Sequence, residues 1–292
     1  MTRTDDGVPH GGAEVATSRA RIPLGPVAFL RRLWRYRDLV WQMTERDARS
    51  RYRGSAGGLF WMAFHPVLML AVYTLFFTEV FPARWSTLAG GGSRADFALV
   101  LFVGLLLHGM LAETLQRAPT LVVGNPNLVR KVVFPLDLLP VMSLGSTLFH
   151  LAIGLAIWLA FHLVLRGLPP ATALWLPLCV LPLALLALGL SWMLASLGVF
   201  LRDVAHVVPV LATVLLFASP IFYPLDALRP PLATLVVASP LTVPVEQARR
   251  VVFDALPPDW GVLAAYAAAA LAVAMLGYAW FQGTRKGFAD VV

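Results

Sequence analysis

The chain has 292 residues, of which 59% are hydrophobic and 13% are charged, and its formal net charge at pH 7 is +7. Soluble domains contain about 45–50% apolar residues, so this composition excludes a single soluble core. The apolar residues gather in runs of about 20, the length that crosses about 30 Å of hydrocarbon. The composition therefore predicts an all-α membrane protein.

Several classes of function are excluded or made remote by what the sequence lacks. The single cysteine, Cys179, can form neither a disulfide framework nor a cysteine metal cluster within one chain. Positive charge beside membrane spans follows from topology alone, so we expect no nucleic-acid partner. No Gly-x-x-x-x-Gly-Lys-Ser/Thr motif occurs, so we expect no ATP hydrolysis by this chain alone. The histidines lack metal-ligand spacing and are predicted to make helix-packing hydrogen bonds, at His65, His108, His150 and His162.

Residues 1–34 are predicted to form a flexible cytosolic tail and residues 35–292 the transmembrane domain. From Val27 to Arg53 we expect an amphipathic helix in the membrane interface, with an ordinary solvated segment as the alternative. Its apolar face follows the spacing i, i+3, i+4 and i+7, at Tyr36, Leu39, Val40 and Met43. Its polar face holds two i, i+4 ion pairs, Glu45 with Arg49 and Asp47 with Arg51.

Six apolar runs are predicted to span the membrane, at residues 58–81, 97–115, 138–165, 174–200, 204–223 and 262–281. Between the fifth and sixth runs, prolines separate apolar pieces of about ten residues, which suit two short re-entrant helices on the outer side. With six spans, 17 of the 23 lysines and arginines fall on the side of the N-terminus. This bias predicts that both termini are cytosolic.

Few ionisable residues lie inside the predicted spans. Glu113 stands four residues before Arg117, so an ion pair on the helix surface at the interface is expected. Aromatic residues are more frequent, at Phe60, Trp61, Phe64, Tyr73 and Phe77 in the first span and Phe217 in the fifth. Such residues usually pack in the core or anchor helices in lipid. The alternative is that they line a passage on which sugar rings slide.

Five separated stretches resemble the membrane subunits of polysaccharide ABC exporters, the Wzm-like branch of the ABC-2 type permeases. They are Arg46-Asp47 with Arg51-Tyr52-Arg53-Gly54-Ser55 and Leu59-Phe60-Trp61, Asn125 to Val133 with Phe134-Pro135, Leu201-Arg202-Asp203, Ser219 to Pro224, and Ser239-Pro240-Leu241-Thr242. The resemblance covers about residues 35 to 290. It departs from the family at His65-Pro66, where these permeases often have Asn-Pro, and over the first 30 residues.

The resemblance implies an exporter subunit that moves lipid-linked polysaccharide of the O-antigen, teichoic acid or galactan type across the cytoplasmic membrane. It implies a homodimer joined to two copies of a separate ATP-binding subunit, which would hold ATP and Mg²⁺, while this chain contacts membrane lipids and binds no cofactor. An ABC-2 permease for a drug or another lipid is the alternative. A membrane enzyme or a scaffold is a further alternative from another class.

The resemblance also implies roles for particular residues. The lipid pyrophosphate headgroup would arrive at Arg51, Tyr52 and Arg53, since a guanidinium fork suits phosphate, although positive-inside anchoring alone explains these arginines equally well. The segment that docks on the ATPase would include Asn125, Asn127, Arg130 and Lys131. The outer gate would include Pro220, Phe222, Tyr223 and Pro224. The aromatic residues of spans one and five would form the channel walls.

Overall fold

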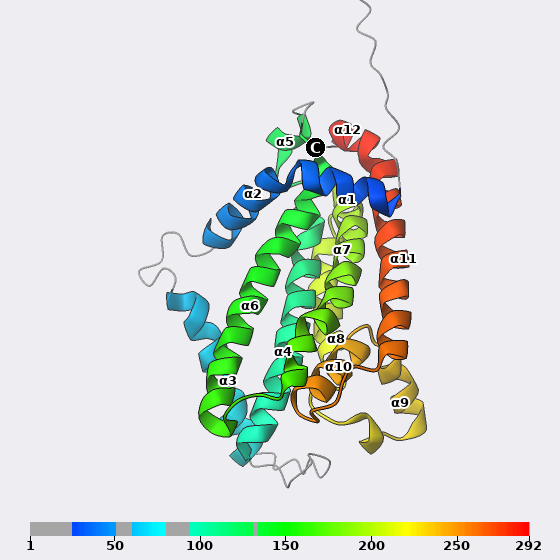
Figure 1. The fold of residues 1–292 in the computed structure, drawn as a ribbon. Coiled ribbons are helices and arrows are strands. Elements are labelled where there is room, and N and C mark those ends of the chain that lie inside the picture. The colour runs from blue at the N-terminus through cyan, green and yellow to red at the C-terminus, as the bar shows by residue number, and fades with distance from the viewer. Residues whose placement is uncertain (1–24, 51–59, 80–93, 131–133, 292) are drawn as a thin grey trace, which may run out of the picture.

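The computed structural model describes residues 25–50, 60–79, 94–130 and 134–291, and every regular element in these residues is a helix. Figure 1 shows long helices side by side, with short helices at both ends of the bundle. The long helices are α3 Phe60–Glu79, α4 Arg94–Arg117, α6 Leu139–Arg166, α7 Leu176–Phe200, α8 Val204–Phe217 and α11 Trp260–Thr284. The short helices are α1 Pro26–Arg35, α2 Arg37–Ser50, α5 Pro126–Arg130, α9 Pro230–Val237, α10 Thr242–Val252 and α12 Phe288–Val291. Single 3-10 turns are η1 Ala118–Thr120, η2 Leu136–Leu138, η3 Ala171–Trp175, η4 Leu225–Ala227 and η5 Arg285–Gly287.

Among the described residues, four helical segments are long and apolar enough to cross a membrane. They are Asp96–Thr120, Leu136–Arg166, Ala171–Phe200 and Trp260–Gly287, and they coincide with four of the predicted spans. The helix α3 occupies most of the predicted first span. The apolar helix α8 ends at Phe217 rather than at residue 223, because Pro220 cannot continue a helix and disfavours helical geometry at Ser219.

The four candidate spans differ in how deeply they are buried. In α4, 72% of the most apolar window is buried inside the chain, whereas the corresponding shares are 22% in α6 and 28% in α11. The helix α4 is therefore the centre of the bundle. The outer faces of α6 and α11 are apolar and uncovered by this chain, which is what helices that face lipid require.

Helices α7 and α11 cross closely through small residues. A Cβ atom on Gly189 would lie 2.7 Å from the Cα of Ala274, and a Cβ on Gly277 would collide with the backbone oxygen of Gly189. Ala270 and Ala274 are buried on this face of α11. Small residues let two backbones approach in this way where lipid offers no hydrophobic driving force.

The two ends of the bundle carry different elements. Helices α1, α2, α5 and α12 lie at one end, and α9 and α10 lie at the opposite end (Figure 1). The two short helices predicted between the fifth and sixth spans are therefore present as α9 and α10. The helix predicted from Val27 to Arg53 is present as two helices that meet at Tyr36, with α1 beginning at Pro26 and α2 ending at Ser50. Residues 26–34, assigned to the tail from the sequence, are therefore helical. The contacts of Phe29 with Trp192 and Tyr278 hold this helix against α7 and α11.

Candidate functional site

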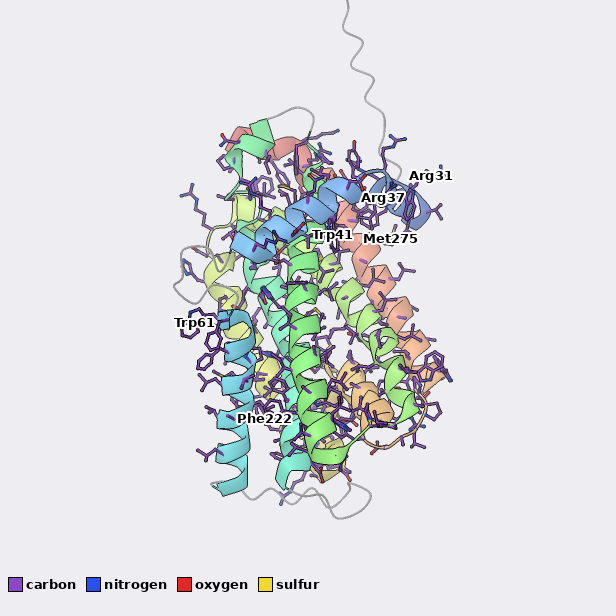
Figure 2. All side chains as sticks on the ribbon, turned by 60° about the vertical axis from the view of Figure 1, so that its left-hand side comes forward. Arg31, Arg37, Trp41, Trp61, Phe222 and Met275 are labelled. Carbon is purple, nitrogen blue, oxygen red and sulfur yellow. The ribbon has the colours of Figure 1, made fainter. Side chains whose placement is uncertain are left out.

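Three of the predicted channel aromatics form one cluster at the start of α3. The ring of Phe64 has its centroid 5.3 Å from the ring centroids of both Phe60 and Trp61. Phe60 is 62% exposed, and Figure 2 shows Trp61 projecting away from the bundle. The structure thus presents a continuous aromatic surface at this helix end. The predicted headgroup residues Arg51, Tyr52 and Arg53 lie outside the described residues.

A cavity of about 400 Å³ lies between α3, α4, α6 and α8. We call it the central cavity, and Tyr73 lines it together with Met69 of α3 and Leu216 of α8. Phe217 does not line the cavity and is 61% exposed. Phe77 belongs to the last turn of α3, and its side chain is not described. Of the predicted channel residues whose side chains the structure describes, Tyr73 alone lines this cavity.

Polar side chains line the α4 and α6 side of the central cavity. The Nδ1 atom of His150 lies 3.6 Å from a carboxylate oxygen of Glu113. The Nε2 atom of His108 donates a hydrogen bond of 2.9 Å to the backbone oxygen of Ala212 in α8, the packing role predicted for histidines. Sequence analysis missed this polar wall, although ionisable residues inside apolar runs were the available signal.

The predicted ion pair between Glu113 and Arg117 is wrong. Arg117 instead donates to both carboxylate oxygens of Asp47, at 2.7 Å each. One guanidinium nitrogen of Arg117 makes both contacts, and this ion pair joins the end of α4 to α2, across 70 residues of sequence. Asp47 was too distant in sequence to be considered as the partner of Arg117. The i, i+4 pair of Glu45 with Arg49 is confirmed, at 2.5 Å.

The segment predicted to dock on an ATPase contains α5, at the same end of the bundle as α1 and α2 (Figure 1). Asn125 precedes this helix, and its side-chain amide donates a 2.9 Å hydrogen bond to the backbone oxygen of Leu121. Asn125 and Asn127 are exposed. The side chain of Arg130 is not described, and Lys131 lies outside the described residues. The side chains of Asn125 and Asn127 are therefore accessible to a partner at this end of the bundle.

A buried ion pair fastens the chain that follows α5 to the helix α1. Arg32 donates to a carboxylate oxygen of Asp137 at 3.0 Å, and the Asp137 side chain is fully buried. Trp192 of α7 donates its indole N–H to the backbone oxygen of Asp137 at 2.9 Å. One residue thus connects α1, α7 and the segment that leaves α5. This junction was not predicted, because Arg32 and Asp137 are 105 positions apart.

The predicted outer-gate residues follow α8 at the opposite end of the bundle. Pro220 is buried, whereas Phe222 and Tyr223 are half-buried. The ring of Phe222 stacks on that of Phe217 with 5.7 Å between centroids, and the Tyr223 hydroxyl donates to the backbone oxygen of Phe217 at 2.6 Å. Pro224 precedes η4. The structure therefore joins one predicted channel residue to the predicted gate.

Arg249 and Ser239 hold the segment of the predicted gate, residues 219–224, and sequence analysis predicted neither contact. Arg249 of α10 is 7% exposed and donates to the backbone oxygen of Ile221 at 2.9 Å. The hydroxyl groups of Ser219 and Ser239 are both buried and lie 2.7 Å apart. The gate segment is thus fixed to α10 and to the turn that precedes it.

Burial also shifts the pKa values of Arg249 and Glu246, which form an ion pair. Arg249 donates to a carboxylate oxygen of Glu246 at 3.0 Å. Burial raises the pKa of the Glu246 carboxyl, which the Arg249 guanidinium opposes. Burial likewise lowers the pKa of Arg249, against the effect of Glu246. Across the described residues, no group of three His, Cys, Asp or Glu side chains is placed to hold a metal ion.

Comparison with known proteins matches residues 38–253 to the ABC-2 type transporter family. The O-antigen export system permease protein RfbA of Myxococcus xanthus is 26% identical over 268 residues, which cover 91% of this chain and 100% of the relative. The protein of the same name from Klebsiella pneumoniae is 22% identical over 205 residues, which cover 70% of this chain and 76% of that relative. The family match extends from α2 to the residue after α10, which is most of the chain. This chain therefore belongs to the ABC-2 type transporter family.

Proposed function

We propose that this chain is the transmembrane subunit of an ABC exporter that moves lipid-linked polysaccharide, of the O-antigen, teichoic acid or galactan type, across the cytoplasmic membrane. The observation that carries this proposal is the similarity to RfbA of Myxococcus xanthus along its whole length, because the name of that relative gives O-antigen export. The five sequence motifs that resemble polysaccharide permeases support it independently of that name.

The transmembrane domain occupies residues 35–292, with α1 as an addition at its N-terminal edge. It crosses the membrane six times, with α3 and α8 as the first and fifth spans, and both termini are cytosolic. The support is the asymmetry of the bundle: α1, α5 and α12 share one end (Figure 1), and most of the lysines and arginines that the structure describes fall on the elements and turns of that end. The helices α9 and α10 are then re-entrant at the outer face.

The energy comes from a separate ATP-binding subunit, which holds ATP and Mg²⁺. Two copies of it bind a homodimer of this chain. Support comes from the ABC-2 family match and from the absence of a phosphate loop in the sequence. The exposed Asn125 and Asn127 mark the surface that docks on this subunit, together with Arg130 and Lys131. The buried pair of Arg32 with Asp137 then transmits a push on α5 to α1.

The substrate enters beside Arg51, Tyr52 and Arg53, which bind the lipid pyrophosphate, and the chain carries the sugar polymer along aromatic walls. The cluster of Phe60, Trp61 and Phe64 supports this path, since it begins seven positions after Arg53 in the sequence. Flat rings suit sugars because they offer contact without tight binding. The gate at the far end includes Pro220, Phe222, Tyr223 and Pro224, and Arg249 holds it to α10.

The test is reconstitution of this chain with its ATP-binding subunit in liposomes. Lipid-linked glycan is supplied on one side, and its arrival on the other side is measured with and without ATP. We expect ATP-dependent transfer, and we expect Arg51→Ala combined with Arg53→Ala to reduce it at normal assembly. The matched control is Arg46→Ala combined with Arg49→Ala, which removes the same charge from described residues of α2.

The outcomes separate the proposal from its alternatives. Transfer of a drug or a simple lipid, with no transfer of glycan, would assign the chain to another ABC-2 substrate class. Turnover of a substrate by this chain without any ATP-binding subunit would make it a membrane enzyme. Normal glycan transfer by the variant Arg51→Ala with Arg53→Ala would show that these arginines do not bind the substrate and serve only to anchor the chain at the membrane.

A further inference from the structure

A second cavity, of about 390 Å³, lies on the opposite side of the bundle from α3, between α1, α6, α7 and α11. None of the residues that line it lines the central cavity. We call it the α1 groove, because Phe29 and Leu30 of α1 form one edge and Leu271 and Met275 of α11 form another. It is therefore separate from every surface assigned above to glycan transport.

The lining of the α1 groove suits hydrocarbon. It consists of leucine, alanine, methionine and aromatic side chains, and it presents no polar surface to the groove. The two lining side chains that carry a polar atom are Trp192 and Tyr278: the indole N–H of Trp192 donates to the backbone oxygen of Asp137, and the Tyr278 hydroxyl is buried. The helices α6 and α11 beside the groove bury only 22% and 28% of their apolar windows, so lipid surrounds the groove. The occupant that fits is an acyl chain.

An acyl chain alone would gain little by entering the groove, since a lipid tail in the bilayer is already in an apolar environment. Selective binding therefore depends on the headgroup. Helix α1 has the sequence PVAFLRRLWR, which contains three arginines and no acidic residue. Arg32 is engaged by Asp137, which leaves Arg31 and Arg35, both exposed, to meet a ligand.

The exposed face of α1 places these arginines beside an apolar stripe. Val27, Leu30 and Trp34 are 67%, 60% and 71% exposed and follow at i, i+3 and i+7. Figure 2 shows Arg31 on the part of α1 that lies at the α11 side of the bundle, and Met275 on α11 nearby. A helix with this pattern lies in the headgroup region with its apolar stripe toward the acyl chains.

We propose that the α1 groove binds an anionic phospholipid from the leaflet on the α1 side, with one acyl chain between α1 and α11 and the phosphate at Arg31 and Arg35. The lipid then forms part of the contact that holds α1 against the bundle. Basic residues at a membrane surface attract anionic lipid by about fivefold each in binding constant, so the two arginines supply most of the selectivity.

The experiment uses the full chain in detergent, with phosphatidylglycerol or phosphatidylcholine added in equal amounts, and counts retained lipid by native mass spectrometry. We expect one phosphatidylglycerol per chain to be retained preferentially. Met275→Trp fills the groove and should abolish that retention. The control is Leu276→Trp, which adds the same volume at a position that is 67% exposed and does not line the groove.

The contribution of the headgroup is tested separately with Arg31→Gln combined with Arg35→Gln, since both side chains are exposed. The preference for phosphatidylglycerol should fall by about tenfold or more. Arg46→Gln combined with Lys286→Gln removes the same charge from the same end and should leave the preference intact. Equal retention of the two lipids by the unmodified chain, or equal effects of test and control variants, would overturn the proposal.

Discussion

At the scale of single residues, the fully buried carboxylate of Asp137 has an arginine from a different helix as its partner. Removing one member of a buried ion pair leaves an uncompensated charge and costs about 3–5 kcal/mol. We therefore expect Arg32→Gln to lower the melting temperature in detergent strongly. The combined change Arg32→Gln with Asp137→Asn should lower it less, because no charge is then left alone.

Thermal unfolding of these two variants and of a control, followed by fluorescence in detergent, measures this difference. Arg46→Gln is the control, since its side chain is exposed on the neighbouring helix α2. An equal loss for Arg32→Gln and for the double variant would show that the ion pair contributes nothing specific. A loss for Arg46→Gln as large as that for Arg32→Gln would show a general effect of charge at this end of the bundle.

The carboxyl of Glu246 makes the stability of the folded chain depend on pH. Burial raises the pKa of its carboxyl above the ordinary value of 4.5, although Arg249 opposes the shift and Asp254 and Asp226 add to it. A raised folded-state pKa stabilises the folded chain below pH 4.5, and this contribution is lost as the pH rises through the raised pKa. We expect Glu246→Gln to flatten that fall in melting temperature. Asp203→Asn, at the opposite end, should leave the profile unchanged.

Single-residue contacts were predictable only where both partners lie on one helix. The pair of Glu45 with Arg49 follows from helical spacing and is present. Spacing also suggested Glu113 with Arg117, but Arg117 instead pairs with Asp47 of α2. Contacts across the fold, such as that of Arg249 with the backbone of Ile221, leave no periodic trace in a sequence.

At the scale of helices, the crossing of α7 and α11 depends on two glycines that face each other. A side chain on Gly277 would meet the backbone oxygen of Gly189, which cannot move as a flexible side chain can. We expect Gly277→Ala to destabilise the chain by about 1–3 kcal/mol. The control is Gly283→Ala on the same helix, where a Cβ would meet nothing within 4 Å.

Helix propensity makes this comparison sharper. Replacing glycine by alanine inside a helix stabilises it by about 1 kcal/mol when space is available. Gly283→Ala should therefore raise the melting temperature slightly, while Gly277→Ala lowers it. The same sign for both variants would mean that propensity, not the crossing, sets the stability of α11.

The central cavity allows a substitution that blocks space without disturbing packing. Gly109 lines the cavity, and a Cβ built there meets nothing within 4 Å. If the glycan passes along Tyr73, Gly109→Leu should reduce ATP-dependent glycan transfer severalfold while expression and assembly stay normal. Gly283→Leu, in equally open space on α11, is the control. Unchanged transfer by Gly109→Leu would place the path outside this cavity.

Most helices could be predicted from the sequence, because an apolar run of sufficient length has few other structures in lipid. The end of α8 at Phe217 was placed too late, since apolar residues continue past the point where Pro220 stops the helix. The division of the N-terminal amphipathic helix at Tyr36 was not predicted, because no proline or glycine interrupts the sequence between Val27 and Arg53.

At the scale of the whole molecule, the proposed orientation can be tested chemically. The single native cysteine is buried in α7, so Cys179→Ser gives a background without thiols. In that background, Asp226→Cys should react with a membrane-impermeant maleimide added to intact cells. Asn127→Cys, exposed at the opposite end, should react only after the cells are permeabilised. The reverse pattern would invert the proposed topology.

The break at Tyr36 has a consequence for how force can pass through this end of the molecule. Helix α1 is fastened to Asp137, and α2 is fastened separately to Arg117 at the end of α4. A continuous helix tilts as one rigid body, whereas two helices joined at one residue can change their angle to each other. We therefore expect that displacement of the chain after α5 tilts α1 about Tyr36 while α2 keeps its angle.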